Sequence, residues 1–281
     1  MRRYSGHGHP PAPRRILDGL RLRGIASLEW VAPVGDGSAP PIRFRVRTVH
    51  EYNRATSAMH NEPGTLRWIR DAVSPGDVFY DVGANIGVFA LAAAHRTGPT
   101  GRVIAFEPHA ATVEALLQNV ALNGLGERID VLSCALHSES GHRSFLYRSL
   151  AAASGLSQID ATCDPHGRDV APVAHEIKAV AAADDLVADG TIARPDVVKI
   201  DVDGNELAVL EGMEGLLTGP GRPRSVQVEV NPLGGVDVLE FMRASRYRET
   251  ARHRTSGSER LIRAGADPAS LGINVVFEQR P

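Results

Sequence analysis

The chain of 281 residues is 43% hydrophobic and 23% charged, a composition that supports one large buried core. Its formal net charge of −2 at pH 7 excludes a strong overall field that would attract nucleic acid or an anionic membrane. Its two cysteines exclude a disulfide scaffold, and no apolar run approaches the roughly 20 residues that span a bilayer. We therefore expect a soluble cytoplasmic protein with neither nucleic acid nor membrane as a partner.

The N-terminal part of the chain differs in composition from the rest. Prolines and glycines punctuate residues 1–40, and the first dozen residues hold so little apolar material that we expect disorder there. A short helix is predicted over residues 16–20. Residues 25–31 and 42–49 are predicted to form a strand hairpin that leads into the main domain.

From residue 66 onward, strand and helix patterns alternate. Strands are predicted over residues 78–82, 103–107, 129–135, 144–147, 177–180, 197–202, 225–230 and 273–278. Helices are predicted over residues 66–73, 86–95, 109–123, 183–188, 206–217 and 236–244. Beyond Tyr247, two strand-like pieces joined by a polar loop without a helix predict a terminal antiparallel hairpin. The alternation is typical of a doubly wound, Rossmann-like α/β sheet, here with an N-terminal extension over residues 1–55 and a main domain over residues 56–281.

The most informative segment is Asp81-Val82-Gly83-Ala84-Asn85-Ile86-Gly87, which joins a predicted strand to a predicted helix. Glycines at such a turn let a ligand approach bare backbone, and the start of the helix supplies unpaired N–H groups. The next predicted strand ends in Glu107-Pro108, where an acid is placed to bind both hydroxyls of a ribose. This spacing predicts a nucleoside site.

The type of nucleoside is indicated by a glycine that is missing from the turn. A dinucleotide site needs a second glycine that admits the pyrophosphate, and Asn85 occupies that position. S-adenosylmethionine has a ribose but no phosphate, so it fits the pattern. Asp81 and Gly83 are then predicted to line its methionine end, Glu107 to bind the ribose, and Ala135, after the third core strand, to border the adenine.

The order of these motifs resembles the FkbM family of class I S-adenosylmethionine-dependent methyltransferases. The resemblance runs from residue 62 to residue 232 and is carried by Gly76-Asp77-Val78, Asp81 to Gly87, Gly101 to Pro108, Asn119 to Gly124, Lys199 to Leu207, Leu210-Glu211-Gly212 and Val228 to Pro232. The family more often has Glu-Gly-Ala-Glu where this chain has Asp203-Gly204-Asn205-Glu206.

The resemblance implies a class I methyltransferase sheet and S-adenosylmethionine as the cofactor. Together with the motif it gives the expected cofactor-binding residues Glu62, Asp81, Gly83, Asn85, Gly87, Glu107, Pro108, Ala135 and Asp201. Glu62 has a second interpretation, because an acid just before a helix also serves as its cap.

Acids also follow the fourth and fifth core strands, and ligands of doubly wound sheets lie beyond these strand ends. A hydroxyl acceptor gains from a base or a metal, so we predict Asp201 as the acceptor-side catalytic acid, with Glu229 second. With Asn231 they are also suitable ligands for Mg²⁺, which stays an open suggestion. Alternatively, Asp203 and Glu206 cap the next helix and Glu229 pairs with an arginine.

The predicted function is O-methylation of a small-molecule acceptor, a sugar or a natural-product scaffold. Two alternatives stay open, a nicotinamide-dependent Rossmann oxidoreductase and a non-catalytic cofactor-binding partner subunit. A base-modifying nucleic-acid methyltransferase is disfavoured, because Asp201-Val202-Asp203-Gly204 stands where those enzymes often have Asp/Asn-Pro-Pro-Tyr/Phe. Residues 149–175 are predicted to be a loop that covers the site together with the hairpin and the tail. The sequence is compatible with a homo-oligomer.

Overall fold

The computed structural model describes residues 29–32, 41–161, 163–164 and 166–280. The helix expected at residues 16–20 and the expected disorder before it lie outside the described residues. Strands β1 (Glu29–Ala32) and β2 (Ile42–Arg45) pair antiparallel, in the stretch where the sequence predicts a hairpin.

The main sheet has seven strands in the order β12-β13-β11-β10-β3-β4-β5. Its strands are β3 (Val78–Val82), β4 (Arg102–Phe106), β5 (Ile129–Leu132), β10 (Val197–Ile200), β11 (Ser225–Val230), β12 (Tyr247–His253) and β13 (Ile273–Gln279). The first five run parallel, whereas β13 is antiparallel to both of its neighbours. The chain moves outward from β3 to β5 and then returns to β10, so the strand order reverses between β3 and β10, where ligands of such sheets bind.

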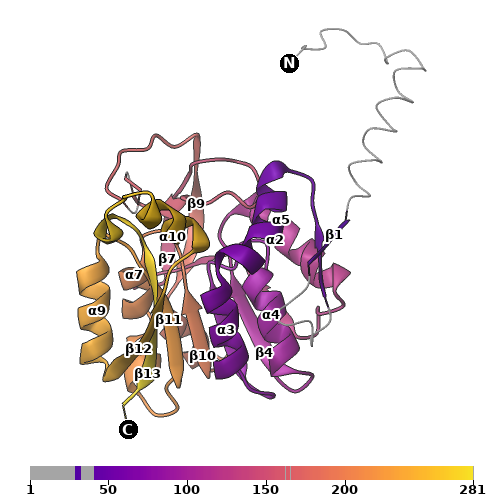
Figure 1. The fold of residues 1–281 in the computed structure, drawn as a ribbon. Coiled ribbons are helices and arrows are strands. Elements are labelled where there is room, and N and C mark those ends of the chain that lie inside the picture. The colour runs from indigo at the N-terminus through magenta and orange to yellow at the C-terminus, as the bar shows by residue number, and fades with distance from the viewer. Residues whose placement is uncertain (1–28, 33–40, 162, 165, 281) are drawn as a thin grey trace.

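Helices cover both faces of this sheet (Figure 1). One face carries α3 (Pro63–Ala72), α4 (Val88–Thr97) and α5 (Ala110–Leu122), and the other carries α6 (Ala183–Ala188), α7 (Glu206–Glu211), α8 (Glu214–Thr218) and α9 (Gly235–Ala244). Successive side chains of β3 point to opposite faces of the sheet and so contribute to both cores. Phe79 packs with the first group of helices, and Tyr80 and Val82 pack with the second. The predicted doubly wound α/β fold is therefore confirmed.

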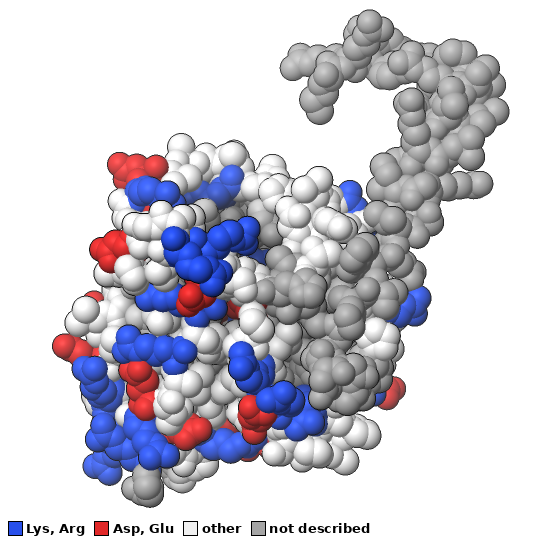
Figure 2. Space-filling model, in the orientation of Figure 1, with Lys and Arg blue, Asp and Glu red and all other residues white. Residues whose placement is uncertain are grey.

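The outer surface is mixed in charge. Figure 2 shows basic and acidic side chains interleaved over one face of the molecule. Among the residues that the structure describes, no helix is both long enough and apolar enough to cross a membrane.

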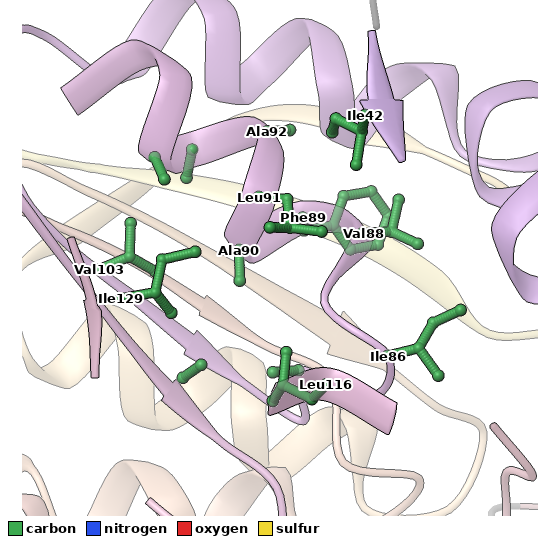
Figure 3. Close-up of a cluster of buried hydrophobic side chains, with 14 of the residues drawn as sticks. Ile42, Ile86, Val88, Phe89, Ala90, Leu91, Ala92, Val103, Leu116 and Ile129 are labelled. Carbon is green, nitrogen blue, oxygen red and sulfur yellow. The ribbon is translucent and has the colours of Figure 1, made fainter. Parts of the chain in front are cut away.

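Helix α4 lies at the centre of the larger core. Its residues 88–94 are apolar on all sides, and a helical segment of that kind is stable only when buried. Phe89 and Leu91 lie with Val103 of β4, Ile129 of β5 and Leu116 of α5 in one cluster (Figure 3). This packing fixes the start of α4, and with it the turn that follows β3.

Helix α2 (Val49–Asn61) has no counterpart in the sequence prediction, which continues a strand to residue 49. Its start is a capping box in which Glu51 N donates to Thr48 Oγ1 at 3.1 Å and Thr48 N donates to Glu51 Oε2 at 2.8 Å. The helix contacts α3, α4, β1 and α10 (Ser256–Arg263). The predicted boundary between the N-terminal extension and the main domain, at residues 55 and 56, lies inside α2 and stays a prediction.

A second, four-stranded sheet has the order β6-β9-β7-β8. Its strands are β6 (Ala135–Leu136), β7 (Gly141–Tyr147), β8 (Gln158–Ile159) and β9 (Ala174–Ala181). The strand predicted over residues 129–135 is thus interrupted, because β5 ends at Leu132 and the chain then joins this sheet. The predicted loop over residues 149–175 holds β8 and an isolated bridge between Cys163 and Asp169.

Two further predictions need correction. The helix predicted over residues 206–217 is divided into α7 and α8 at Gly212, where a Cβ would lie 1.9 Å from the backbone oxygen of His137. The C-terminal strands β12 and β13 do pair antiparallel, but the segment between them contains α10 and the 3-10 helix η1 (Pro268–Ser270). Helix α10 begins where Thr255 Oγ1 accepts a hydrogen bond from Ser258 N at 3.0 Å.

Candidate active site

A cavity of about 230 Å³ lies beyond the carboxyl ends of β3, β4, β10 and β11. Helix α2, the second sheet and Thr255 close its other sides. Eight of the predicted site residues line it, namely Glu62, Gly83, Asn85, Glu107, Pro108, Ala135, Asp201 and Glu229. The loop over residues 149–175 contributes Ser154, Ser157, Gln158 and Ile159, so the predicted cover is present on that side.

Glu107 and Asn85 are joined by a backbone hydrogen bond. Glu107 Oε2 accepts from Asn85 N at 2.9 Å, and its Oε1 accepts from His109 N at 2.8 Å. Burial raises the pKa of Glu107 to about 7. Because each carboxylate oxygen has two lone pairs, both oxygens can still accept a hydroxyl hydrogen from a ligand. Asn85 has a φ of 51°, so the turn keeps the left-handed backbone of a glycine while adding a side chain.

Gly83 holds the turn after β3 close to the end of β10. Its φ is +79°, and a Cβ there would lie 1.9 Å from the carbonyl oxygen of Asp201. The adjacent N–H groups of Gly83 and Ala84 both donate to the Phe106 carbonyl at 3.0 Å. The absence of a side chain at Gly83 therefore serves the packing of two strand ends as well as access for a ligand.

Two predicted cofactor-binding residues, Asp81 and Gly87, lie outside the cavity lining. Asp81 is fully buried, and its Oδ1 lies 3.4 Å from Lys199 Nζ. A Cβ at Gly87 would lie 2.6 Å from Leu116 Cδ1, so this glycine makes room for α5. Both residues therefore contribute to the packing around the cavity rather than to its lining.

Lys199 connects Asp81 with Asp201. Its Nζ lies 3.2 Å from Asp201 Oδ2 and 5.0 Å from the centre of the Phe89 ring, and the side chain is 1% exposed. Burial alone would lower the pKa of Lys199, but Asp201 and Asp81 raise it above its ordinary value. Sequence reasoning did not assign Lys199 to the site, although a lysine inside the apolar strand Val197–Ile200 is a signal of a buried ion pair.

The pKa values of Asp201 and Glu229 are shifted in opposite directions. Burial alone would raise the pKa of Asp201, but Lys199 and Arg54 hold it below its ordinary value. Burial and the charge of Asp201 raise the pKa of Glu229 well above its ordinary value. Glu229 Oε2 accepts a hydrogen bond from Asn231 Nδ2 at 2.9 Å, and the Glu229 carboxyl also shares a hydrogen bond with Asp201. Among the described residues its side-chain partners are therefore an amide and a carboxyl group, without the arginine of the alternative interpretation.

Glu206 and Asp203 have separate structural roles. Glu206 Oε1 accepts from the N–H groups of Gly204 at 3.0 Å and Val202 at 3.3 Å, so Glu206 closes the turn before α7. Burial raises its pKa to about 7. Asp203 lines the cavity, and its Oδ2 accepts from Leu156 N at 2.7 Å, which ties the covering loop to the end of β10.

The suggestion of Mg²⁺ gains no support. Within the described ranges, no three histidine, cysteine, aspartate or glutamate side chains are grouped so as to hold a metal ion. Asp201 instead has the ammonium of Lys199 as its cationic partner.

Comparison with known proteins identifies the family. Residues 81–249 match the model of the methyltransferase FkbM domain. The chain is 31% identical over 204 residues to the hexuronic acid methyltransferase AglP of Haloferax volcanii, covering 72% of this chain and 76% of that protein. It is 31% identical over 191 residues to the 31-O-demethyl-FK506 methyltransferase FkbM of Streptomyces tacrolimicus, covering 60% of this chain and 72% of that protein.

A solved structure of a methyltransferase FkbM from Methylobacillus flagellatus is 14% identical, with a TM-score of 0.47, and the match covers 94% of this chain and 60% of that one. With more than half of its residues inside the matched domain, the chain belongs to the FkbM family of methyltransferases.

Proposed function

We propose that the protein transfers a methyl group from S-adenosylmethionine to a hydroxyl of a small-molecule acceptor. One observation carries the proposal: a single cavity joins Glu107, which suits a ribose, to the acids Asp201 and Glu229 at the ends of β10 and β11. Such a cavity provides for a donor at one end and an acceptor at the other.

The charge of the cavity supports this donor over a nicotinamide dinucleotide. Five carboxyl side chains line it, those of Glu62, Glu107, Asp201, Asp203 and Glu229. A dinucleotide would bring two negatively charged phosphates among these acids, whereas S-adenosylmethionine has a positive sulfur and a positive ammonium. Opposite charges attract strongly in a partly buried site, so the cationic donor fits better.

Methyl transfer mainly requires alignment and a place for a proton. S-adenosylmethionine, when bound, supplies a methyl group that its positive sulfur already activates. We assign proton acceptance to Asp201, because Lys199 and Arg54 keep it ionised, so that it takes the hydroxyl proton as the new oxygen–carbon bond forms. Because burial and the charge of Asp201 raise the pKa of Glu229, this carboxyl holds its proton more tightly than Asp201 does, and we assign to it a hydrogen bond that orients the acceptor oxygen.

A hydroxyl-rich acceptor matches the remaining walls of the cavity. Side chains with amide or hydroxyl groups line it, those of Asn61, Ser154, Ser157, Gln158, Asn205 and Thr255. One relative is named for a hexuronic acid and another for a demethylated natural product. We therefore propose an acceptor of the sugar type, free or as part of a larger scaffold.

Equilibrium titration of the purified protein with S-adenosylmethionine tests the donor. We expect one binding site, and we expect Glu107→Gln to weaken binding at least about 10-fold, because a lost charged hydrogen bond costs about 1.5–3 kcal/mol. Glu206→Gln is the matched control, since Glu206 is equally buried but does not line the cavity. If the wild type does not bind, or if both variants bind like the wild type, the proposal is wrong.

The acceptor step is tested with S-adenosylmethionine labelled in its methyl group and a panel of sugars, uronic acids and polyketide alcohols. We expect label in a product that resists mild alkali, as a methyl ether does and a methyl ester does not. Asp201→Asn is expected to abolish this transfer. A product that alkali cleaves would place the methyl group on a carboxylate and contradict transfer to a hydroxyl.

A further inference from the structure

Arg54 on α2 has no ion-pair partner in the part of the chain that the structure describes. Arg54 and Lys199 are the cationic lysine or arginine side chains in the described lining of the cavity. Lys199 is engaged by Asp81 and Asp201. Among the described residues, no carboxylate lies within ion-pair distance of Arg54 and no side-chain hydrogen bond is formed by its guanidinium. A partly buried guanidinium of this kind is costly unless it meets an anion.

Carboxylates surround Arg54 without touching it. The positive charge of Arg54 acts to lower the pKa of Glu62, Glu107, Asp201 and Asp203. Arg54 Nη2 lies 4.0 Å from the position that a Cβ on Gly155 would take, so the guanidinium lies beside the covering loop. The space between Arg54 and these acids is therefore part of the cavity, and a ligand there meets both signs of charge.

Glu62 is the acid nearest to Arg54 along the chain. It stands at the junction of α2 and α3, yet its side chain makes no hydrogen bond that caps α3. Within the described ranges, the Glu62 carboxyl accepts a single long hydrogen bond, of 3.4 Å from Thr65 Oγ1 to its Oε2, and the residue is 6% exposed. Burial and the charge of Asp201 raise the pKa of Glu62 to about 7. Glu62 is therefore also short of a strong partner.

We propose that Arg54 and Glu62 together bind the amino-acid tail of the donor, with Arg54 on its α-carboxylate and Glu62 on its α-ammonium. The amino-acid tail of the donor is a zwitterion, and its binding needs two opposite charges that are not already paired with each other. Helix α2 and the residue that follows it place such a pair, Arg54 and Glu62, in the lining of the cavity. A guanidinium binds a carboxylate through two parallel hydrogen bonds, so Arg54 is suited to that half. The inference rests on the proposed use of S-adenosylmethionine. Glu62 is already among the expected cofactor-binding residues, and the inference adds Arg54 as the residue that selects the α-carboxylate of the donor.

The test compares S-adenosylmethionine with decarboxylated S-adenosylmethionine, which lacks only the α-carboxylate. Binding of both ligands to the wild type and to Arg54→Gln is measured by titration calorimetry. We expect the wild type to prefer the complete donor about 10- to 100-fold, the range of one charged hydrogen-bond pair. Arg54→Gln is expected to lose this preference, with binding of the decarboxylated ligand unchanged within about threefold.

Two more variants complete the experiment. Arg54→Lys keeps the charge but not the two parallel hydrogen bonds, and it is expected to keep part of the preference. Glu62→Gln is expected to weaken binding of both ligands, because both have the ammonium, but not of 5′-methylthioadenosine, which lacks the whole tail.

Several outcomes would overturn the inference. Equal weakening of both ligands by Arg54→Gln would mean that Arg54 only supports α2, and no weakening of either would mean that it faces another anion, such as one on the acceptor. Equal affinity of the wild type for both ligands would overturn it even if the variants failed to fold. If the wild type did not bind S-adenosylmethionine at all, the proposed function itself would fail.

Discussion

Lys199 and Asp81 lie opposite each other on the neighbouring parallel strands β10 and β3, with Lys199 Nζ 3.4 Å from Asp81 Oδ1. The same Nζ lies 3.2 Å from Asp201 Oδ2. One buried ammonium thus links β3, which leads into the turn at Gly83, to Asp201, the proposed proton acceptor. Because α4 packs over this pair through Phe89, both the fold and the site depend on it.

Removing the ammonium should therefore destabilise the protein strongly. Lys199→Met leaves a buried carboxylate without its cation, and we expect a loss of about 3–5 kcal/mol in the free energy of unfolding. Lys178, the other lysine of the chain, is the matched control, because its partner Glu176 is 42% exposed. Lys178→Met is expected to cost about 1 kcal/mol or less. Urea unfolding at neutral pH measures both, and equal losses would contradict the account of Lys199.

A side chain at Gly83 should separate the two strand ends. The Cβ of Gly83→Ala would lie 1.9 Å from the Asp201 carbonyl oxygen, and the backbone φ of +79° adds strain. We expect a loss of about 3–5 kcal/mol, from overpacking and a left-handed backbone together. Gly124→Ala is the control, because Gly124 has a φ of +65° but no atom within 4 Å of the added Cβ. Urea unfolding should show a loss of only about 1–2 kcal/mol there, and similar losses in both variants would contradict the predicted collision.

Asn85 should be replaceable by glycine more easily than by alanine. Its φ of 51° suits glycine and asparagine, and its Oδ1 accepts a hydrogen bond from Ile86 N at 2.9 Å. We expect Asn85→Ala to cost about 1–2 kcal/mol and Asn85→Gly less than about 1 kcal/mol. Thermal unfolding of the two variants checks the order. A more stable alanine variant would mean that the turn does not need the left-handed conformation.

The stability of the protein should depend on pH through Glu206. Burial raises its pKa from 4.5 to about 7, so the folded state binds this proton more tightly than the unfolded state does. The contribution is fully present below pH 4.5 and is lost as the pH rises through 7, by at most about 3 kcal/mol.

Glu206→Gln removes this proton from both states. The free energy of unfolding, measured by urea titration from pH 5 to pH 8, should therefore fall less steeply in the variant than in the wild type. Burial also raises the pKa values of Glu62 and Glu107. These two groups titrate in the variant as well as in the wild type, so their contributions cancel when the two slopes are compared. Identical slopes would show that Glu206 is ionised throughout this range.

The parts of the fold that were predictable have strong local signals. The segment Val78–Val82 is mostly apolar, Ser225–Val230 alternates polar residues with valines, and both are strands with the predicted bounds. In the second sheet, β7 and β9 were predicted in part, over residues 144–147 and 177–180. Strand β8 was not, because a strand as short as Gln158–Ile159 exists only through its pairing with β7. Helix α2 was missed although Thr48 and Glu51 form a capping box, because its polar sequence has a weak apolar stripe.

The site was predictable where a motif fixes the backbone, as at Asn85 and Glu107, which both line the cavity. Asp81 was assigned to the cofactor because it begins the glycine-rich turn motif, whereas in the structure it shares a strand face with Phe79 and points into the core below α4. Arg54 could not be assigned, because its place at the cavity depends on how α2 packs against α3 and α4.

A crystal structure of the protein with S-adenosylhomocysteine tests the central claim most directly. The account predicts that the ribose hydroxyls of this ligand lie within hydrogen-bond distance of Glu107 and that its sulfur lies between the turn at Gly83 and the acid Asp201. A ligand bound outside this cavity, or one whose ribose does not contact Glu107, would contradict it.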